Sequence, residues 1–170
     1  MNFPRILKKR KGYIDRIKPF MQKSVVKVLT GQRRVGKSFL LYQLIEEILA
    51  EEPDANIIYV NLEDFTFSSL QTAEDLHSYI ISHSKEKVKN YIFIDEIQDI
   101  PGFEKVIRSL LLNEDNDIYI TGSNAKMLSG ELATYLSGRY IEFKIYSLSY
   151  SEFLEFHGLT ESETSYELYS

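Results

Sequence analysis

Eight residues near the start of the chain, Gly31 to Ser38, have the types and spacing of a loop that holds phosphate groups. They match the pattern G-x-x-x-x-G-K-[ST] in full. Gly31 and Gly36 let the backbone curl so that several N–H donors converge on one anion, an approach that a Cβ would obstruct. Lys37 can reach the β- and γ-phosphates of a nucleotide, and Ser38 can place its hydroxyl on a magnesium ion. The segment is therefore predicted to bind a nucleoside triphosphate with Mg²⁺.

The chain around this loop contains the elements needed to position it. Residues 25–29 are a β-branched run typical of a strand, and they lead through Thr30 into the loop. Apolar residues then recur near helical spacing over residues 39–49. The loop should therefore open a helix whose free N–H groups and positive dipole end face the phosphates. The residues predicted to hold the nucleotide are Gly31, Gln32, Arg33, Arg34, Val35, Gly36, Lys37, Ser38 and Phe39.

A pair of acidic residues, a second candidate for chemistry, follows another apolar run. Residues 91–94 are typical of a buried strand, and they deliver two carboxylates, Asp95 and Glu96, at its C-terminal end. Sheets of α/β proteins place their ligand chemistry at that end of the strands. We expect Asp95 to be the magnesium partner, directly or through water, and Glu96 to be the general base that activates a water. The pair favours hydrolysis, because a small-molecule kinase takes its nucleophile from a bound acceptor.

Small polar residues follow a third apolar run, at residues 118–121. Thr121, Ser123 and Asn124 are each suited to orient a water or to sense a γ-phosphate. Gly, Ser and Asn also favour turns and helix caps for local backbone reasons, so the sequence does not choose among the three. Arg139 is a candidate γ-phosphate contact in its own subunit or in a neighbour, with a surface ion pair as the alternative. The predicted catalytic residues are Glu96, Lys37, Asn124 and Arg139; the predicted magnesium ligands are Ser38 and Asp95.

Strands and helices alternate along the chain, which predicts an α/β sheet. Further strands are expected at residues 57–60 and 140–145, and further helices at residues 76–81, 103–112 and 149–156. Strands separated by helices of this length form parallel β-α-β units whose sheet is covered on both faces. We therefore predict the three-layer α/β/α sandwich of P-loop NTPases, with five mostly parallel strands.

The charge of the chain is strongly divided, although the whole carries a formal net charge of −5. Residues 1–40 hold twelve Lys and Arg against one acid, whereas the remainder holds eight basic and twenty-four acidic residues. A basic segment of this kind can attract nucleic acid. The alternative is that its cations serve the phosphate loop and the solubility of the surface.

Several classes of protein and site are disfavoured by what the sequence lacks. Without cysteine the chain has neither disulfides nor thiolate metal sites, and His77, His83 and His157 are too scattered to suggest a metal site. Residues 1–11 are basic, but no apolar run follows that is long enough for a signal peptide or a membrane span. We expect a cytoplasmic protein without membrane association.

These stretches together resemble the ATPase domain of an AAA-type (AAA+) protein in the archaeal-type ATPase branch. The resemblance covers nearly the whole chain and is carried by residues 28–38, 61–64, 92–98, 120–124, 136–140 and 147–149, with Glu152 and Phe153. It implies ATP as the nucleotide and the sheet order 5-1-4-3-2, with the strand that ends at Thr121 inserted between the other two functional strands. Family members usually continue into a helical lid and a C-terminal domain.

The favoured function is a switch or motor domain that binds ATP with Mg²⁺ and hydrolyses it to control a partner. We expect a basic leading segment at residues 1–24, an ATPase core at residues 25–157, and a polar tail at residues 158–170 that begins a lid or C-terminal region. Expected partners are that C-terminal domain or another protein, with nucleic acid and a second copy of the chain as further candidates. Two alternatives stay open: a nucleotide-gated module that binds DNA or protein with little turnover, and a P-loop small-molecule kinase.

Overall fold

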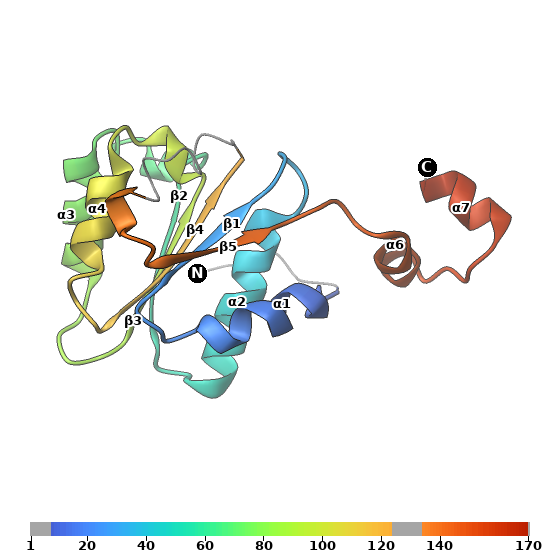
Figure 1. Ribbon diagram of the computed structural model, residues 1–170, viewed down its shortest axis with the longest axis horizontal. Helices are drawn as coiled ribbons and strands as arrows, with labels where there is room; N and C mark the ends of the chain where they lie inside the picture. The colour runs from blue at the N-terminus through green and yellow to red at the C-terminus, as the bar shows by residue number, and fades with distance from the viewer. Residues whose placement is uncertain (1–7, 124–133, 170) are drawn as a thin grey trace.

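The computed structural model describes residues 8–123 and 134–169, and its centre is a parallel sheet (Figure 1). The five strands are β1 (Val26–Thr30), β2 (Asn56–Asn61), β3 (Asn90–Asp95), β4 (Asn116–Gly122) and β5 (Tyr140–Lys144). They lie in the order β2-β3-β4-β1-β5, and every neighbouring pair is parallel. Counted from the other edge, this is the order 5-1-4-3-2, so the predicted fold and strand order are confirmed.

Helices cover both faces of the sheet. The α-helices that pack on the sheet are α1 (Lys11–Ile17), α2 (Lys37–Glu51), α3 (Ala73–His83) and α4 (Phe103–Leu110), and short 3₁₀ turns lie at Lys18–Phe20, Phe65–Phe67 and Ile97–Asp99. Figure 1 shows α1 and α2 on one side of the sheet and α3 and α4 on the other. This arrangement is the predicted three-layer sandwich.

Two hydrophobic clusters form the core, one on each face. Alternate residues of a strand point to opposite faces, and β3 shows this directly. Ile92 and Ile94 join the cluster that contains the buried faces of α3 and α4, while Tyr91 and Phe93 join the cluster built on α1 and α2. The central strands β3 and β4 are buried along their whole length, as expected for a parallel sheet covered on both sides.

Helix α1 was not expected from the sequence, which indicated only a basic leading segment. Ile14 and Ile17 are buried on one face of α1 and pack into the cluster that α2 forms with the sheet. The cations beside them mask this short apolar stripe in the sequence. Residues 11–17 therefore contribute to the core and do not form a solvated arm.

Ion pairs connect the two oppositely charged parts of the chain. Each of the six pairs between described residues joins a cation from the first 40 residues to an acid beyond them. Lys9 and Lys18 both contact Glu47 on α2, at 2.5 and 2.6 Å, and thereby fix the two ends of α1. The basic composition of the segment thus has a structural use within the chain.

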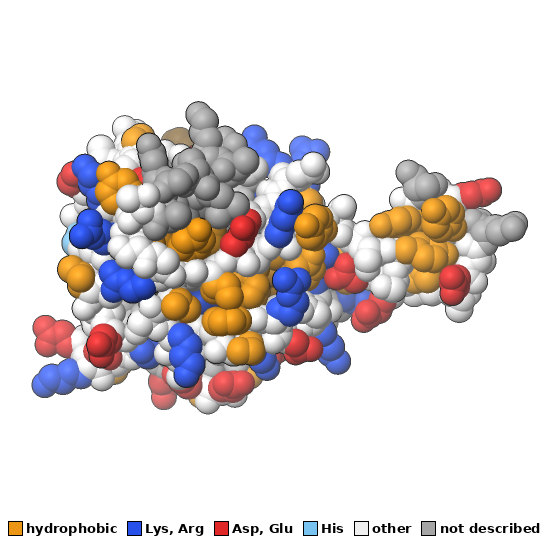
Figure 2. All heavy atoms as spheres, viewed as in Figure 1, with side chains coloured by type: hydrophobic (Ala, Val, Ile, Leu, Met, Phe, Trp, Pro, Cys, Tyr) orange, Lys and Arg blue, Asp and Glu red, His pale blue; other side chains and the backbone are white. Residues whose placement is uncertain are grey.

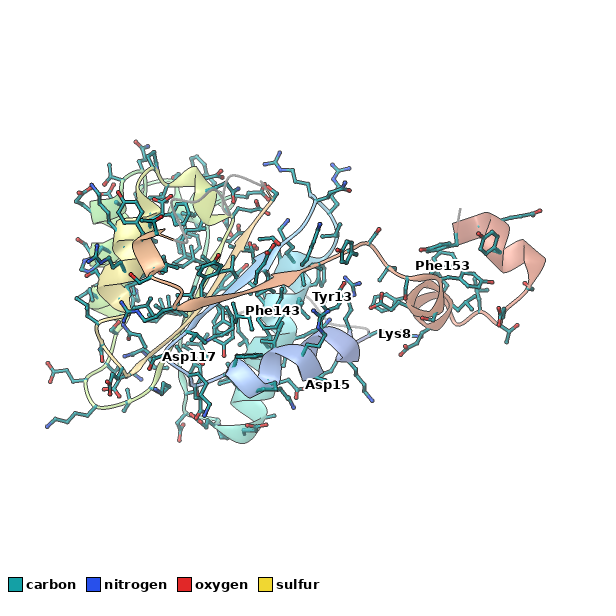
Figure 3. All side chains as sticks on the ribbon, in the orientation of Figure 1. Lys8, Tyr13, Asp15, Asp117, Phe143 and Phe153 are labelled. Carbon is teal, nitrogen blue, oxygen red and sulfur yellow. The ribbon has the colours of Figure 1, made fainter. Side chains whose placement is uncertain are left out.

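One of these pairs is completely buried, at the end of the sheet away from the phosphate loop. Lys27 on β1 donates to Asp117 on β4, and both side chains are fully inaccessible. Asp117, labelled in Figure 3, also accepts from the Tyr119 hydroxyl at 2.7 Å and from the Gln22 backbone N–H at 2.8 Å. Burial lowers the pKa of Lys27, and the Asp117 carboxylate opposes part of that effect. The carboxylate therefore compensates a charge that would otherwise be isolated in the core.

Two further helices, α6 (Tyr150–His157) and α7 (Glu163–Tyr169), lie apart from the sheet after an extended connection. Ser149 caps α6 in a reciprocal capping box with Glu152, and Gly158 ends the helix at a positive φ of 65°. Tyr150 and Phe153 contact Tyr169 through their rings, with centroids 5.5 Å apart in each case. Figure 2 shows hydrophobic side chains gathered on this unit. None of the described helices is both long and apolar enough to cross a membrane.

The buried pair predicts a large effect of removing its cation. In Lys27→Met the Asp117 carboxylate stays in the core without its counter-ion, which should cost about 3–5 kcal/mol of unfolding free energy. Chemical denaturation monitored by circular dichroism measures this loss. Lys23→Met, at an exposed lysine just before β1, is the control and should change little. A loss below about 1 kcal/mol for Lys27→Met would show that the ion pair is not needed.

The contact of α1 with Glu47 predicts an acid dependence. Hydrogen bonds from Lys18 and Lys9 hold the pKa of Glu47 below its ordinary value of 4.5. A carboxylate with a lowered folded pKa stabilises the fold above its ordinary pKa, and this contribution is lost as the pH falls through the folded value. The free energy of unfolding of wild type should therefore exceed that of Glu47→Gln by about 0.5–1 kcal/mol near neutral pH, and the two values should converge in acid. Glu46→Gln, at the exposed neighbour, is the control. If the difference in unfolding free energy between wild type and Glu47→Gln stayed constant into acid, the ionised Glu47 carboxylate would not be its source.

Candidate functional site

Three of the segments predicted to form the site meet at one edge of the sheet because all five strands run in the same direction. Gly31 follows β1, Glu96 follows β3, and Ser123 follows β4, which lies between those two strands. Carboxyl ends of parallel strands meet at the same edge, where α/β folds bind their ligands. The structure thus brings together three segments that are separated by up to 92 positions in the sequence.

The first loop glycine is required by close packing. A Cβ built on Gly31 would lie 2.3 Å from the carbonyl oxygen of Ile145, just beyond β5. The Ile145 N–H also donates to the carbonyl of Thr30 at 2.6 Å, which fixes the separation of the two segments. Gly31 has φ 154°. A larger residue would therefore have to displace either the loop or the end of β5.

The second loop glycine gives the start of α2 its binding capacity. Gly36 is the N-cap residue at φ 92°, a conformation that favours glycine, and no side chain caps this helix among the described residues. The first backbone N–H groups of an α-helix have no partner within the helix. Here they point into the loop with the positive end of the helix dipole behind them, which is the arrangement that binds anions.

Lys37 is held inside the loop. Its side chain is 3% exposed, and Nζ donates to the carbonyls of Gly31 and Gln32 at 3.2 and 3.1 Å. Its third neighbour is Glu96, with 3.2 Å between Nζ and Oε1. The loop lysine and the predicted general base are therefore in direct contact.

Glu96 has an unusual backbone and several side-chain partners. It lies at φ 55°, a left-handed conformation that is uncommon for a residue other than glycine and is concentrated at functional sites. Oε2 accepts from the Ser123 hydroxyl and the Gln98 amide, both at 2.7 Å. Burial would raise the pKa of Glu96, but these hydrogen bonds and the charge of Lys37 outweigh it and leave the pKa below its ordinary value. The carboxylate is thus held ionised and oriented.

Asp95 lies deeper than Glu96. Its Oδ1 accepts from the Thr121 hydroxyl, and Oδ2 lies 3.4 Å from the hydroxyl of Tyr59. The Thr121 oxygen in turn accepts the Glu96 backbone N–H at 3.0 Å. Thr121 therefore links the two acids and lies behind the site, whereas Ser123 reaches the carboxylate of Glu96.

A recess of about 500 Å³ opens over these groups, within the range of pockets that hold small ligands. We call it the inner recess; it is lined by Arg33, Arg34, Gly36, Lys37, Ser38, Phe39, Glu63 and Glu96. Two exposed side chains at its rim, Arg33 and Glu63, form an ion pair at 3.0 Å. Ser38 lies on its wall and Asp95 lies behind it, and these are the two residues that would hold a magnesium ion here. The oxygen donors fit this hard cation.

A second recess of about 490 Å³ lies on the other side of the loop, and we call it the outer recess. It is lined by Arg34, Val35, Ser147, Leu148, Phe153 and Tyr169. Arg34 borders both recesses. The outer recess therefore places aliphatic and aromatic side chains close to the phosphate loop.

The remaining sequence predictions have different outcomes. Asn124 lies outside the described residues. Arg139 is exposed, and its carbonyl accepts the N–H of Val26, at the start of β1 and thus at the opposite end of the sheet from the loop. The structure does not bring Arg139 together with the phosphate loop of its own chain. The described residues contain no cluster of three or more His, Asp or Glu that could hold a metal by itself.

Sequence reasoning missed two residues of the site. Gln98 lies within residues 92–98, one of the stretches that carry the family resemblance. Nothing in the sequence indicates, however, that its amide contacts the carboxylate of Glu96, two residues earlier. Arg10 was one cation in a basic run, yet its guanidinium donates to the carbonyl of Val35 in the phosphate loop at 3.0 Å. A pairing between positions so far apart has no local pattern that could reveal it.

Known proteins provide an independent comparison. An uncharacterized protein of Haemophilus influenzae is 44% identical over 152 residues, which cover 85% of this chain and 37% of that protein. The chain thus spans little more than a third of the length of this relative. The ORC1 protein of Aeropyrum pernix, solved in complex with DNA, superposes with a TM-score of 0.60 at 15% identity, over 97% of this chain and 51% of that one.

Domain III of the replication initiation protein DnaA from Thermotoga maritima superposes with the same TM-score of 0.60 at 14% identity, over 94% of this chain and 75% of that one. At such low identity, both structural matches support the fold alone. The family model described as "AAA domain" matches residues 23–154, from the segment before β1 into α6. The expected AAA-type membership is thus confirmed, and the chain belongs to the AAA domain family.

Proposed function

We propose that the chain binds ATP with Mg²⁺ at the phosphate loop and hydrolyses it to ADP and inorganic phosphate. The observation that carries this proposal is the contact between Lys37 and Glu96 beneath the uncapped start of α2. The Lys37 ammonium and the backbone N–H groups at the start of α2 can bind negative charge there, and the Glu96 carboxylate lies beside them. Triphosphate binding uses the first two features and hydrolysis uses the third.

Binding should redistribute the partners of Lys37. Phosphate oxygens that reach Nζ compete with Glu96, whose contact is a single one at 3.2 Å. The N–H groups at the start of α2 and the hydroxyl of Ser38 add further contacts to phosphate and metal. A bound magnesium ion would neutralise charge on the phosphates. Lys37 would then bind the phosphate oxygens of the nucleotide, and the Glu96 carboxylate could accept a hydrogen bond from a new partner.

Glu96 is suited to be the base in the second step. Ser123 and Gln98 keep Oε2 in place, so Oε1 can accept a proton from a water when Lys37 turns to the phosphates. The oxygen of that water attacks the γ-phosphorus, the bond to the β-phosphate oxygen breaks, and the proton goes to Glu96 before release to solvent. Since no separate acceptor is required, water is the nucleophile that the site supports.

The nucleoside end of ATP is assigned to the outer recess. This recess adjoins the loop through Arg34 and offers Val35, Leu148 and Phe153 to an apolar, flat group. Aromatic and aliphatic walls with few polar groups are typical of small-molecule sites. Together the two recesses provide for both ends of one nucleotide.

Partner binding stays a prediction. Nucleotide-dependent control of a C-terminal domain or of another protein is consistent with the greater length of the Haemophilus influenzae relative. The positive charge of the basic segment is less in need of nucleic acid as an explanation, because Lys9, Arg10 and Lys18 form ion pairs with acids of the chain. Arg139, exposed at the far end of the sheet, would act on the nucleotide of a second copy if the chain assembles.

Two variants separate binding from turnover. Lys37→Ala should weaken ATP binding about 10–100-fold, since it removes a charged donor from the phosphates. Glu96→Gln should keep ATP bound and lower turnover about 10²–10⁴-fold. Titration calorimetry and phosphate release measure the two effects. Lys105→Ala and Glu46→Gln, at exposed positions on α4 and α2, are the matched controls. Turnover by Glu96→Gln at the wild-type rate would exclude Glu96 as the base.

The packing of Gly31 predicts a selective loss of binding. In Gly31→Ala the new Cβ meets the Ile145 carbonyl oxygen at 2.3 Å, so the loop must shift. Strain of about 1–3 kcal/mol should weaken ATP binding roughly 5–150-fold while the sheet stays folded. Gly12→Ala on α1, where a Cβ has no neighbour within 4 Å, is the control and should bind normally. Unchanged affinity of Gly31→Ala would mean that the loop tolerates the displacement.

A further inference from the structure

Arg10, immediately before α1, has a buried side chain with a complete set of acceptors. It is 5% exposed. Nε and Nη2 donate to the two oxygens of Glu152 at 2.8 and 3.0 Å, a bidentate contact. Nη1 donates to the carbonyls of Val35 and Tyr146, both at 3.0 Å, and Nη2 also reaches the carbonyl of Ser147 at 3.4 Å. All five N–H donors of the guanidinium are thereby used.

These acceptors come from three separate parts of the chain. Val35 belongs to the phosphate loop, Tyr146 and Ser147 to the connection after β5, and Glu152 to α6. They lie 25 to 142 positions away from Arg10 in the sequence. A planar group with five fixed donors sets distances and angles together. Arg10 therefore holds the loop, the connection and α6 in one arrangement.

The arginine is itself anchored on the sheet side. Its backbone N–H donates to Gln43 on α2 at 2.9 Å, and Gln43 is buried. The guanidinium lies over the ring of Tyr13, with 4.5 Å between Cζ and the ring centroid. Figure 3 labels Tyr13 on α1 and Phe153 on α6, the two helices that this junction connects. Arg10 is thus a fixed point against which α6 is placed.

Glu152 is the partner that belongs to α6. Besides Arg10 it accepts the Ser149 backbone N–H at 2.9 Å, so the same carboxylate caps its own helix. The hydrogen bonds from Arg10 lower the pKa of Glu152, against the opposing effect of burial. Its side chain is 25% exposed, so a near-isosteric change can be made there without opening the core.

Two of the residues that accept hydrogen bonds from Arg10 also line the outer recess. Val35 and Ser147 accept from Arg10 and line the recess, and Phe153, next to Glu152, lines it as well. The width of the recess is the separation between the loop and the connection with α6. Arg10 bridges these two sides from behind.

We propose that Arg10 and Glu152 are positioning residues that set the shape of the outer recess and thereby the affinity for the nucleoside part of the nucleotide. The proposal rests on the proposed function, because it assigns the nucleoside to that recess. The triphosphate contacts at Lys37 and the start of α2 do not involve Glu152. Loss of the pair should therefore affect the two ends of the ligand unequally.

The test compares ATP with tripolyphosphate, which carries the phosphates without a nucleoside. Both are titrated with Mg²⁺ into wild type, Glu152→Gln and Glu155→Gln, the last being a control at an exposed glutamate on the same helix. Glu152→Gln should bind ATP about tenfold more weakly, as expected for a lost charged hydrogen bond, and tripolyphosphate within about twofold of wild type. Glu155→Gln should match wild type for both ligands.

A second variant tests whether the two residues act as a unit. Arg10→Lys keeps the positive charge and loses the fork, so it should also weaken ATP selectively. The double variant Arg10→Lys, Glu152→Gln should then lose less than the product of the two single losses, because both disrupt the same contact. Independent multiplication of the two effects would contradict a shared role.

The other outcomes are also decisive. Equal weakening of ATP and tripolyphosphate by Glu152→Gln would show that the pair supports the loop or the whole fold, and an unfolded variant falls in this class. Unchanged ATP affinity in Glu152→Gln would remove the pair from nucleotide binding while leaving the proposed function intact. Wild type that binds neither ligand would overturn the proposed function and this proposal with it.

Discussion

The start of α2 imposes the main constraint on this structure, because backbone N–H groups and a lysine are concentrated there and none of the described side chains caps them. The fold must prevent these donors from being satisfied by collapse of the loop. Gly31 does so by packing directly beneath the Ile145 carbonyl, and Gly36 by turning the chain at a positive φ. Lys37 is steadied by two loop carbonyls and Glu96. The loop is thus held open by contacts with two other segments, the one after β5 and the one after β3.

The division of charge along the chain connects segments that are far apart in the sequence. Cations of the first 40 residues pair with acids spread over the rest of the chain, from Glu47 on α2 to Glu152 on α6. The pairs of Lys9 and Lys18 with Glu47 hold α1 against α2, and Arg10 connects the phosphate loop with α6. Exposed pairs such as Arg33 with Glu63 contribute little energy individually. The buried contacts of Lys27 and Arg10 fix geometry, since a charge removed from water must keep its partner.

Local patterns in the sequence predicted the fold class and the residues at the centre of the site. The spacing of Gly31, Gly36 and Lys37 predicts a phosphate loop because the backbone geometry needs those residue types within eight positions. The acids after β3 were equally visible. The sheet order came from family resemblance, since periodicity does not specify which strands are neighbours. Helix α1 and the role of Arg10 were missed because the partners of Ile14 and Arg10 lie far along the chain.

The pair of acids shows how the backbone can direct two neighbouring carboxylates to different places. Asp95 ends β3 in regular extended backbone and is enclosed by Thr121 and Tyr59, so it lies behind the inner recess. Glu96 turns into the left-handed region, and this turn directs its carboxylate into the inner recess. The Thr121 oxygen that accepts the Glu96 N–H supports that conformation. A left-handed backbone supported by a buried hydroxyl therefore separates a carboxylate that lines the recess from one that lies behind it.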